Sequence, residues 1–407
     1  MHAQLFESLS HALTQVQGYI YPNELELQWS ILIVLYPYIT GLVAGAFILA
    51  SLERVFNVKA VKPTYRLALL TALAFLIVAP LPLNLHLGHP ERAFQILFTP
   101  NPTSAMAMFG FVYLWYLMAV LLMEVWLDYR KEIVGWSKTE PWAPKRLFYK
   151  IVTFGVDNVS PRSLEIDDKL GKALTVIGLP SAVLLHGYVG FIFGSIKANP
   201  WWSTPLMPII FLFSAMASGI AGVLLLYMIL SAYRNKDTDM KCLDTIGKFF
   251  LTALVLAFSL EMLETIQQIY EAEEHFDILS LLVQGKLYFS VFFVQLLMGS
   301  LIPMFLLGLI QLTDLPEKVR KAFYAASATF CLIGIFAMRW NVVIGGQFFS
   351  KSLRGFTTYK LELVGREGLL SAVVVMILPF VILAALIYLL PPWENAEHAP
   401  PAKSSET

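Results

Sequence analysis

The chain has 407 residues, of which 57% are hydrophobic and 14% charged, and its formal net charge is zero. Together with a mean hydropathy of +0.66, these values exclude an ordinary soluble domain, because a soluble core could not hide so much apolar surface. There is no long block of Lys or Arg, which argues against nucleic acid as a partner. The two cysteines, Cys242 and Cys331, are too few for an iron–sulfur cluster and lack the pattern of covalent haem attachment.

Residues 1–28 lack the charged and apolar regions of a signal peptide, and we expect them to form an outer N-terminal segment. The apolar runs that follow predict about nine transmembrane helices. These runs cover residues 29 to 52, 65 to 87, 104 to 127, 172 to 196, 205 to 233, 245 to 270, 286 to 312, 320 to 345 and 369 to 390. The fold class is therefore predicted to be all-α and polytopic, with a transmembrane domain at 29–390 and a disordered cytoplasmic tail at 391–407.

Basic residues in the connections predict the orientation, because Lys and Arg are retained on the cytoplasmic side of a membrane. The longest connection, residues 128–171, is rich in them. This places the N-terminus outside and the tail inside, in the inner (cytoplasmic) membrane of a cell. Residues 346–368 disagree, because they should be outside and yet contain basic side chains; they are Lys351, Arg354, Lys360 and Arg366. Either this loop docks on an acidic partner or one span is miscounted.

Ionisable residues inside spans are functional candidates, because each costs about 2.5 to 3.5 kcal/mol at a helix centre. They gather in the outer halves of the helices: His186, Glu261, Glu264 and Arg339, with Asn84 and His86 at the outer end of another helix. Glu261 and Glu264 are three residues apart and share a helix face, and Arg339 is their natural counter-ion. Two interpretations stay open: a proton-transfer route through these residues, or a helix-to-helix ion pair without a role in turnover.

His186 and Tyr188 form a second candidate site, in a segment that also contains Gly187 and Gly190. A histidine and a tyrosine near one another can donate hydrogen bonds to a quinone carbonyl and handle its protons. The alternative is that the small residues pack helices together and His186 bonds to a neighbouring helix.

The histidines limit the metal chemistry of the chain. A membrane cytochrome b with two haems needs four imidazole ligands inside the bilayer, whereas only His186 lies well within a span. A single haem on His86 and His186 stays open as an alternative. We expect no metal site, haem or iron–sulfur cluster in this chain.

Motifs in the connections resemble the polysulfide reductase membrane-subunit family, NrfD/PsrC-like, over most of the chain. The motifs are Leu87-Gly88-His89-Pro90-Glu91-Arg92, Asn101-Pro102-Thr103-Ser104, Tyr188-Val189-Gly190 and Trp202-Ser203-Thr204-Pro205-Leu206-Met207-Pro208. Two further blocks, at 213–219 and 338–347, are most similar to the DsrP branch of this family, which occurs in DsrMKJOP complexes associated with sulfite reduction.

The resemblance implies a four-helix bundle with a quinone pocket near the outer face, no haem of its own, and an outer iron–sulfur protein beside it. By motif match, the quinone-contacting tyrosine of the family corresponds to Tyr188; we expect His186, His86 and Asn84 at the quinone as well. The residues expected at the pocket mouth or at the contact with the partner are His89, Glu91, Arg92, Trp201 and Trp202.

The expected function is therefore that of a quinone-interacting membrane subunit of a respiratory oxidoreductase complex. It would exchange electrons between menaquinone or menaquinol and an outer-face iron–sulfur subunit in sulfur metabolism, with a multi-haem cytochrome c and further membrane or cytoplasmic subunits as candidate partners. The alternatives are an ion- or proton-coupled secondary transporter, for which paired Glu and Arg within spans would be expected, and a purely structural membrane anchor.

Overall fold

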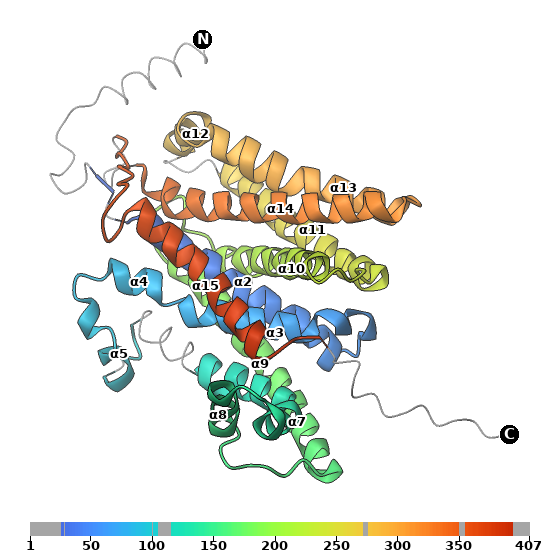
Figure 1. Cartoon of the computed structure of the whole chain (residues 1–407). Coiled ribbons are helices and arrows are strands. Elements are labelled where there is room, and N and C mark those ends of the chain that lie inside the picture. The colour runs from blue at the N-terminus through green and yellow to red at the C-terminus, as the bar shows by residue number, and fades with distance from the viewer. Residues whose placement is uncertain are drawn as a thin grey trace.

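The computed structural model describes residues 26–27, 29–99, 101–104, 115–271, 276–349 and 355–393. Within these ranges the regular secondary structure is helical, apart from two isolated bridges that join Glu26 to Thr358 and Phe349 to Phe356. Figure 1 shows long helices packed along one another, with several shorter helices around them. This confirms the predicted all-α architecture.

Eight stretches of the described residues are long and apolar enough to cross a membrane. They contain α2 (Ile31–Arg54), η1 (Lys59–Val61) with α3 (Lys62–Val78) and α4 (Leu81–His86), α9 (Pro161–Gly194), α10 (Met207–Tyr233), α11 (Met240–Glu271), the π-helical η4 (Phe289–Leu301) with α13 (Ile302–Leu312), α14 (Glu317–Val343) with η5 (Gly345–Gln347), and α15 (Leu369–Leu389). The remaining helices are η2 (Pro90–Arg92), α5 (Gln95–Phe98), the π-helical η3 (Tyr116–Leu121), α7 (Leu122–Thr139), α8 (Ala143–Val152) and α12 (Phe276–Gln284).

The eight stretches coincide with eight of the predicted apolar runs. The other predicted run, 104 to 127, falls partly on residues 105–114, which lie outside the described residues; its residues 116–127 are helical and belong to η3 and α7. Most of the predicted outer segment, 1–28, and of the predicted tail, 391–407, also lies outside the described residues.

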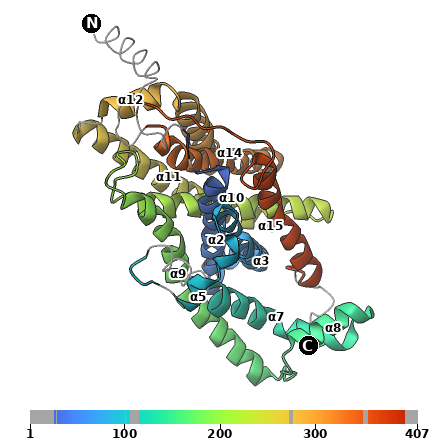
Figure 2. The same ribbon diagram turned by 90° about the vertical axis from the view of Figure 1, so that its left-hand side faces the viewer.

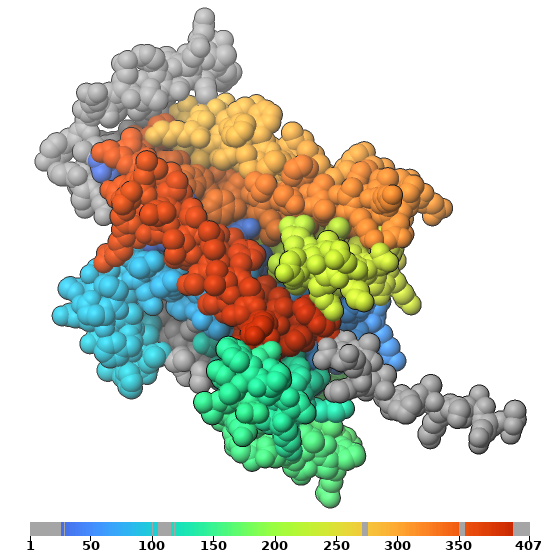
Figure 3. All heavy atoms as spheres, viewed as in Figure 1, coloured from blue at the N-terminus to red at the C-terminus, as the bar shows by residue number. Residues whose placement is uncertain are grey.

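Helix α2 is the buried centre of the molecule and contacts α3, α9, α10 and α14 (Figure 2). Because α10 also packs on α3 and α9, the helices α2, α3, α9 and α10 form a four-helix bundle. A second group, made of α11, η4, α13 and α14, packs against this bundle through α10 and α2. Helix α15 lies on α3 and crosses the face seen in Figure 3 toward α7 and α8.

Two pairs of glycines allow helices to touch through their backbones. A Cβ atom on Gly219 of α10 would lie 2.4 Å from the Cα of Gly45 on α2, and one on Gly299 of η4 would lie 2.4 Å from the Cα of Gly334 on α14. Such distances leave no room for any side chain. Close backbone approach at small residues is a principal means of helix association in membranes, where lipid removes the hydrophobic drive.

The two ends of the molecule are built from different helices and connections. Helices α4, α5 and α12 and residues 355–368 share one end, which we call the predicted outer end (Figure 1). The α2–α3 and α10–α11 connections lie at the other, the predicted inner end. Near it, Asp128 binds Arg54 at 3.0 Å and Arg66 at 2.8 Å, which ties α7 to α2 and α3.

Candidate functional site

His186 lies within the α9 span, and its side chain is wholly buried. Its Nε2 is 3.0 Å from an Nη atom of Arg339, and its Nδ1 is 3.4 Å from Oγ1 of Thr40. Because a guanidinium only donates, Nε2 accepts and the ring proton resides on Nδ1. The Thr40 hydroxyl itself donates to the carbonyl of Tyr36 at 3.0 Å, which leaves its oxygen free to accept that proton. In this arrangement His186 is neutral, and protein groups occupy both of its ring nitrogens.

Arg339, on α14, is also wholly buried and is held largely by uncharged groups. In addition to its bond with His186, it donates to Oγ of Ser214 at 2.7 Å and to the carbonyl of Phe211 at 3.4 Å. Its guanidinium carbon lies 3.9 Å from the centre of the Phe211 ring, a cation–π contact. Together with Thr40, these residues join α2, α9, α10 and α14, and we call them the His186 cluster.

Glu261, on α11, begins a separate series of hydrogen bonds. Its Oε2 accepts from Nε2 of Gln295 at 3.1 Å, and Oε1 of Gln295 accepts from Nδ2 of Asn341 at 2.8 Å. Oδ1 of Asn341 accepts in turn from the hydroxyl of Ser290 at 2.6 Å. These four residues, which we call the Glu261 chain, connect α11, η4 and α14. In the part of the protein that the structure describes, Glu261 makes no hydrogen-bonded pair with Arg339, although the two charges are close enough to attract each other.

Glu264 lies one turn further along α11 than Glu261 and is also held by uncharged groups. Its Oε2 accepts from Oγ1 of Thr204 at 2.6 Å, and its Oε1 accepts from Nε2 of Gln268 at 3.0 Å. Since Thr204 is in the connection between α9 and α10, Glu264 fastens this connection to α11. The expected ion pair of both carboxylates with Arg339 is thus replaced, for these atoms, by hydrogen bonds to neutral partners.

Tyr188 does not lie beside His186. Two residues correspond to about 200° around an α-helix, so the two side chains leave α9 in nearly opposite directions. The Tyr188 ring stacks on Phe191, with 5.9 Å between ring centres, and is only half-buried. The structure therefore separates the two residues that were expected to act on one quinone carbonyl.

His86 and Asn84 lie on α4, apart from the His186 cluster. Nδ1 of His86 is 2.7 Å from Oε2 of Glu367, just before α15, with 23% of the His86 side chain and 30% of the Glu367 side chain exposed. Asn84 is half-buried on the same short helix. Glu367 lies outside the predicted spans and the family motifs, so no sequence pattern pointed to it.

A cavity of about 410 Å³ adjoins this pair at the predicted outer end. Its lining includes Trp29, Ser30, Tyr359 and Glu367. The hydroxyl of Tyr359 accepts a hydrogen bond from the backbone of Ile31 at 3.0 Å, and burial raises the pKa of Tyr359. Two aromatic rings, two hydroxyls and the carboxylate of Glu367 thus line one opening, and His86 is connected to it through its bond with Glu367.

The turn after α4 is exposed, as a contact with another protein requires. His89 and Glu91 bond to each other at 3.0 Å, with 67% and 65% of their side chains exposed, and Arg92 is exposed as well. Large apolar side chains follow them on and beside α5, among them Phe94 and Phe98.

The two tryptophans of the α9–α10 connection are less exposed than the turn after α4. Trp202 is buried: its ring stacks on Trp29 at 5.6 Å, and its Nε1 donates to the carbonyl of Val342 at 2.6 Å. Trp201 is half-buried and packs against the hydrophobic core. Trp202 therefore fixes the connection to the end of α14, and its burial does not favour the predicted contact with a partner.

Several polar residues at these sites were not predicted, because apart from Asn84 the candidates within the spans were ionisable groups. They are Thr40, Ser214, Ser290, Gln295 and Asn341. The amide residues carried the clearest signal, since Gln295 stands alone among apolar residues and Asn341 lies two positions from Arg339.

The fold and these sites define a class: a polytopic membrane protein that keeps networks of polar side chains among its spans. Among the described residues, no group of three or more His, Cys, Asp or Glu could hold a metal ion. The chain belongs to the NrfD family, since the family model "Polysulphide reductase, NrfD" matches residues 22–351. It is thus a membrane subunit of the NrfD/PsrC type, as its motifs predicted.

Curated relatives agree with this family. The C subunit of selenate reductase from Mesobacillus selenatarsenatis is 32% identical over 324 residues, which cover 78% of this chain and 73% of the relative. The Hdr-like menaquinol oxidoreductase integral membrane subunit of Archaeoglobus fulgidus is 23% identical over 54% of this chain and 47% of its own length. The C component of polysulfide reductase from Wolinella succinogenes is 24% identical over 44% of this chain and 55% of its own length.

Proposed function

We propose that this chain is the quinone-interacting membrane subunit of a respiratory oxidoreductase complex, exchanging electrons between menaquinone or menaquinol and an iron–sulfur protein at the predicted outer end. Membership of the NrfD family supports this, as does the similarity to a menaquinol oxidoreductase membrane subunit. The observation that carries the proposal is the His86–Glu367 pair beside a cavity lined by Trp29 and Tyr359.

The lining of this cavity also includes the charged residues Glu26, Lys360, Glu362 and Arg366, and its aromatic and hydroxyl side chains are the ones that fit a quinone headgroup. The flat faces of Trp29 and Tyr359 suit a planar ring, and the hydroxyls of Ser30 and Tyr359 are groups that bind a quinone oxygen. A volume of about 410 Å³ lies within the range of small-molecule sites. The start of α2 and the segment before α15 would hold the headgroup between them.

A quinone and its quinol differ by two electrons and two protons, and this is the chemistry that the bound group supplies. The protein must supply or remove the protons. An imidazole can both accept and release a proton, and Nδ1 of His86 is 2.7 Å from a carboxylate oxygen of Glu367, so the two side chains can share one. Because both side chains are partly exposed, a proton held at His86 can exchange with water.

The deeper residues receive separate roles in this proposal. Glu261 and Glu264 serve proton transfer, with Gln295 fixing the direction in which the Glu261 carboxylate points. Arg339 and His186 hold α9, α10 and α14 in register, and Arg339 supplies a positive charge near Glu261. Tyr188 contacts the quinone tail or ring from the lipid side of α9, where a quinone approaches through the bilayer.

The proposed partner is an iron–sulfur protein that docks at the exposed turn carrying His89, Glu91 and Arg92. We further propose a DsrMKJOP-like complex of sulfur metabolism, with a multi-haem cytochrome c among its subunits. Affinity purification of the tagged protein from its native membrane, followed by mass spectrometry, tests both statements. Co-purification of a molybdopterin subunit in place of the cytochrome would contradict the second statement alone.

The quinone site is tested with Glu367→Gln and His86→Ala in the intact complex. General acid–base catalysis contributes about a hundredfold or more, so each variant should lower quinol turnover on that scale while the subunits stay assembled. Glu165→Gln is the matched control, because Glu165 forms an exposed ion pair with Lys169 across one turn of α9 and does not line the cavity. Wild-type turnover in both cavity variants would instead support a purely structural anchor.

A further inference from the structure

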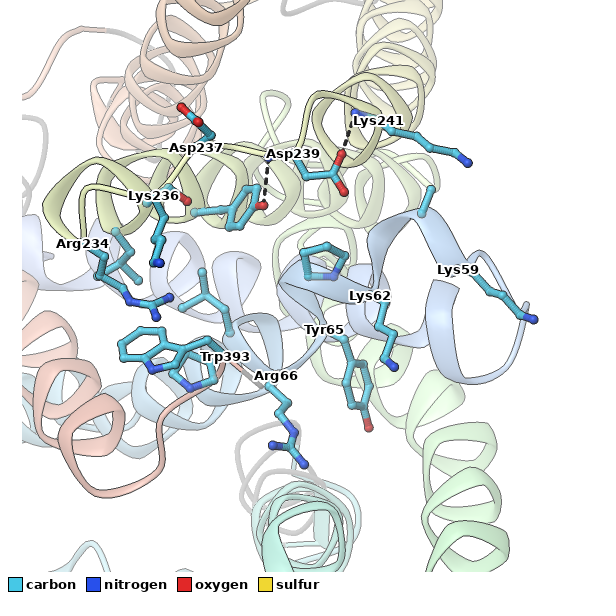
Figure 4. Close-up of a pocket in the computed structure, with 17 residues that line it drawn as sticks. Lys59, Lys62, Tyr65, Arg66, Arg234, Lys236, Asp237, Asp239, Lys241 and Trp393 are labelled. Atoms are coloured by element: carbon cyan, nitrogen blue, oxygen red, sulfur yellow. Dashed lines mark hydrogen bonds between the residues drawn. The ribbon is translucent and has the colours of Figure 1, made fainter. Parts of the chain in front are cut away.

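A second cavity, of about 560 Å³, lies at the predicted inner end among the α2–α3 connection, the α10–α11 connection and residues 392–393 (Figure 4). Its charged lining is mostly basic. The basic residues are Lys59, Lys62, Arg66, Arg234, Lys236 and Lys241, and the acidic ones are Asp237 and Asp239. This excess of positive charge in one concave site favours an anion as ligand.

Part of this charge is already compensated by the protein. Oδ1 of Asp239 accepts from the backbone N–H groups of Lys241 and Cys242, so this carboxylate caps the start of α11. Arg66 is bound by Asp128 and Glu132 of α7. In contrast, no carboxylate of the described residues forms an ion pair with Arg234 or Lys236, which leaves these two charges for a ligand.

Arg234 and Lys236 are held at the depth of the membrane surface. Helix α10 ends at Tyr233 and α15 ends at Leu389, so the residues just beyond these ends lie where lipid headgroups lie. The guanidinium carbon of Arg234 is 3.6 Å from the centre of the Trp393 ring, and Trp favours this interface. In Figure 4 the side chains of Arg234 and Lys236 extend toward Trp393, whereas Lys59 and Lys241 extend outward.

A separate apolar groove of about 110 Å³ lies deeper in the membrane-spanning part, lined by residues of α2, α3, α10, α14 and α15. Leu67 and Leu230 line the basic cavity, while Thr71 and Leu226, one turn deeper on the same helices, line the groove. The groove ends among apolar side chains such as Phe380 of α15. A soluble anion would use only the basic cavity, whereas a lipid would use both.

We propose that these two neighbouring cavities bind one anionic phospholipid of the phosphatidylglycerol or cardiolipin class, with a phosphate at Arg234 and Lys236 and an acyl chain along α3, α10 and α15 toward the groove. Basic pockets between helices on the cytoplasmic side are the general form of such sites. The lipid joins the end of α15 to α3 and α10 and is independent of the quinone proposal.

The test is a titration of the purified complex with dioctanoyl phosphatidylglycerol, followed by native mass spectrometry. Each Lys or Arg near an anionic headgroup contributes about a fivefold change in affinity, so Arg234→Gln/Lys236→Gln should bind the lipid about 25-fold more weakly. The control, Arg162→Gln/Lys172→Gln, removes the same charge from exposed positions on α9 and should bind like the wild type. Dioctanoyl phosphatidylcholine should bind as weakly as phosphatidylglycerol binds to the double variant.

Three outcomes overturn the proposal. Equal binding of the two lipids would show that the charge has no role. Competition by inorganic phosphate at the concentrations at which phosphatidylglycerol binds would assign the cavity to a soluble anion. Loss of a cytoplasmic subunit from the double variant, with an unchanged content of phospholipid, would assign it to a protein partner.

Discussion

The contact between Gly45 and Gly219 leads to the sharpest prediction about stability. In Gly219→Ala, the new Cβ would lie 2.4 Å from the Cα of Gly45 and 2.5 Å from the backbone nitrogen of Ala46. Ordinary van der Waals contact begins near 3.4 Å, so α2 and α10 must separate by about 1 Å. Overpacking of this kind costs about 3 kcal/mol where backbone, and not a flexible side chain, must yield. This is more than a hundredfold in the unfolding equilibrium.

The assay is unfolding of the detergent-solubilised protein, by heat or by denaturing detergent, with Gly308→Ala as control. Gly308, on α13, has no atom within 4 Å of an added Cβ. Ala is the better helix former by up to about 1 kcal/mol, so the control should equal or exceed the wild type. Equal stability of the two variants would refute the close approach of α2 and α10.

Three further predictions concern single contacts. Trp202→Phe keeps the ring stacking but removes the hydrogen bond of 2.6 Å to the carbonyl of Val342; it should destabilise the protein by about 1 to 2 kcal/mol in the same unfolding assay, and an unchanged midpoint would contradict this. Gln295→Leu removes the donor to Glu261; under the proposed function, proton-coupled turnover should fall while assembly is kept, and full activity would exclude the Glu261 chain from the route. Asp128→Asn removes the carboxylate that Arg54 of α2 and Arg66 of α3 share. Because both arginines are largely shielded from water, the free energy of unfolding should fall by about 2 kcal/mol. An unchanged unfolding temperature would show that water solvates the two guanidinium groups instead.

Much of the fold could be predicted because hydrophobicity over a span is a local property of the sequence. The bounds of runs such as 205 to 233 and 369 to 390 agree with those of α10 and α15 to within two residues. The packing order of the helices is not local. Gly45 and Gly219, which set the distance between α2 and α10, are 174 positions apart, and nothing in either run specifies the other.

The candidate site was predicted only in part. His186 and Arg339 were recognised because buried ionisable groups are rare in spans, and the structure bonds them to each other. Their hydrogen-bond partners were not predicted: Arg339 bonds to an imidazole and a hydroxyl, whereas Glu261 bonds to an amide. Uncharged polar residues cost less in lipid and occur in many spans, so sequence alone does not mark which of them will pair.

Proximity in sequence was also a poor guide to proximity in space. His186 and Tyr188 share one motif, but the helical turn sends them to different surroundings. His86 and Glu367 are 281 positions apart and form a hydrogen bond of 2.7 Å. The roles proposed for these four residues stay predictions until the variants are measured.

Helix α14 carries Arg339 and Asn341 two positions apart, and each is bonded to a different set of neighbours. Rolling this helix about its long axis by one residue, roughly 100°, would turn a charge or an amide toward hydrocarbon. Polar contacts on two faces of α14 therefore fix its rotation about its own axis. A ligand or partner that rotates α14 would change the contacts of Arg339 and of Asn341 together. The Glu261 chain and the His186 cluster are therefore mechanically coupled through this helix.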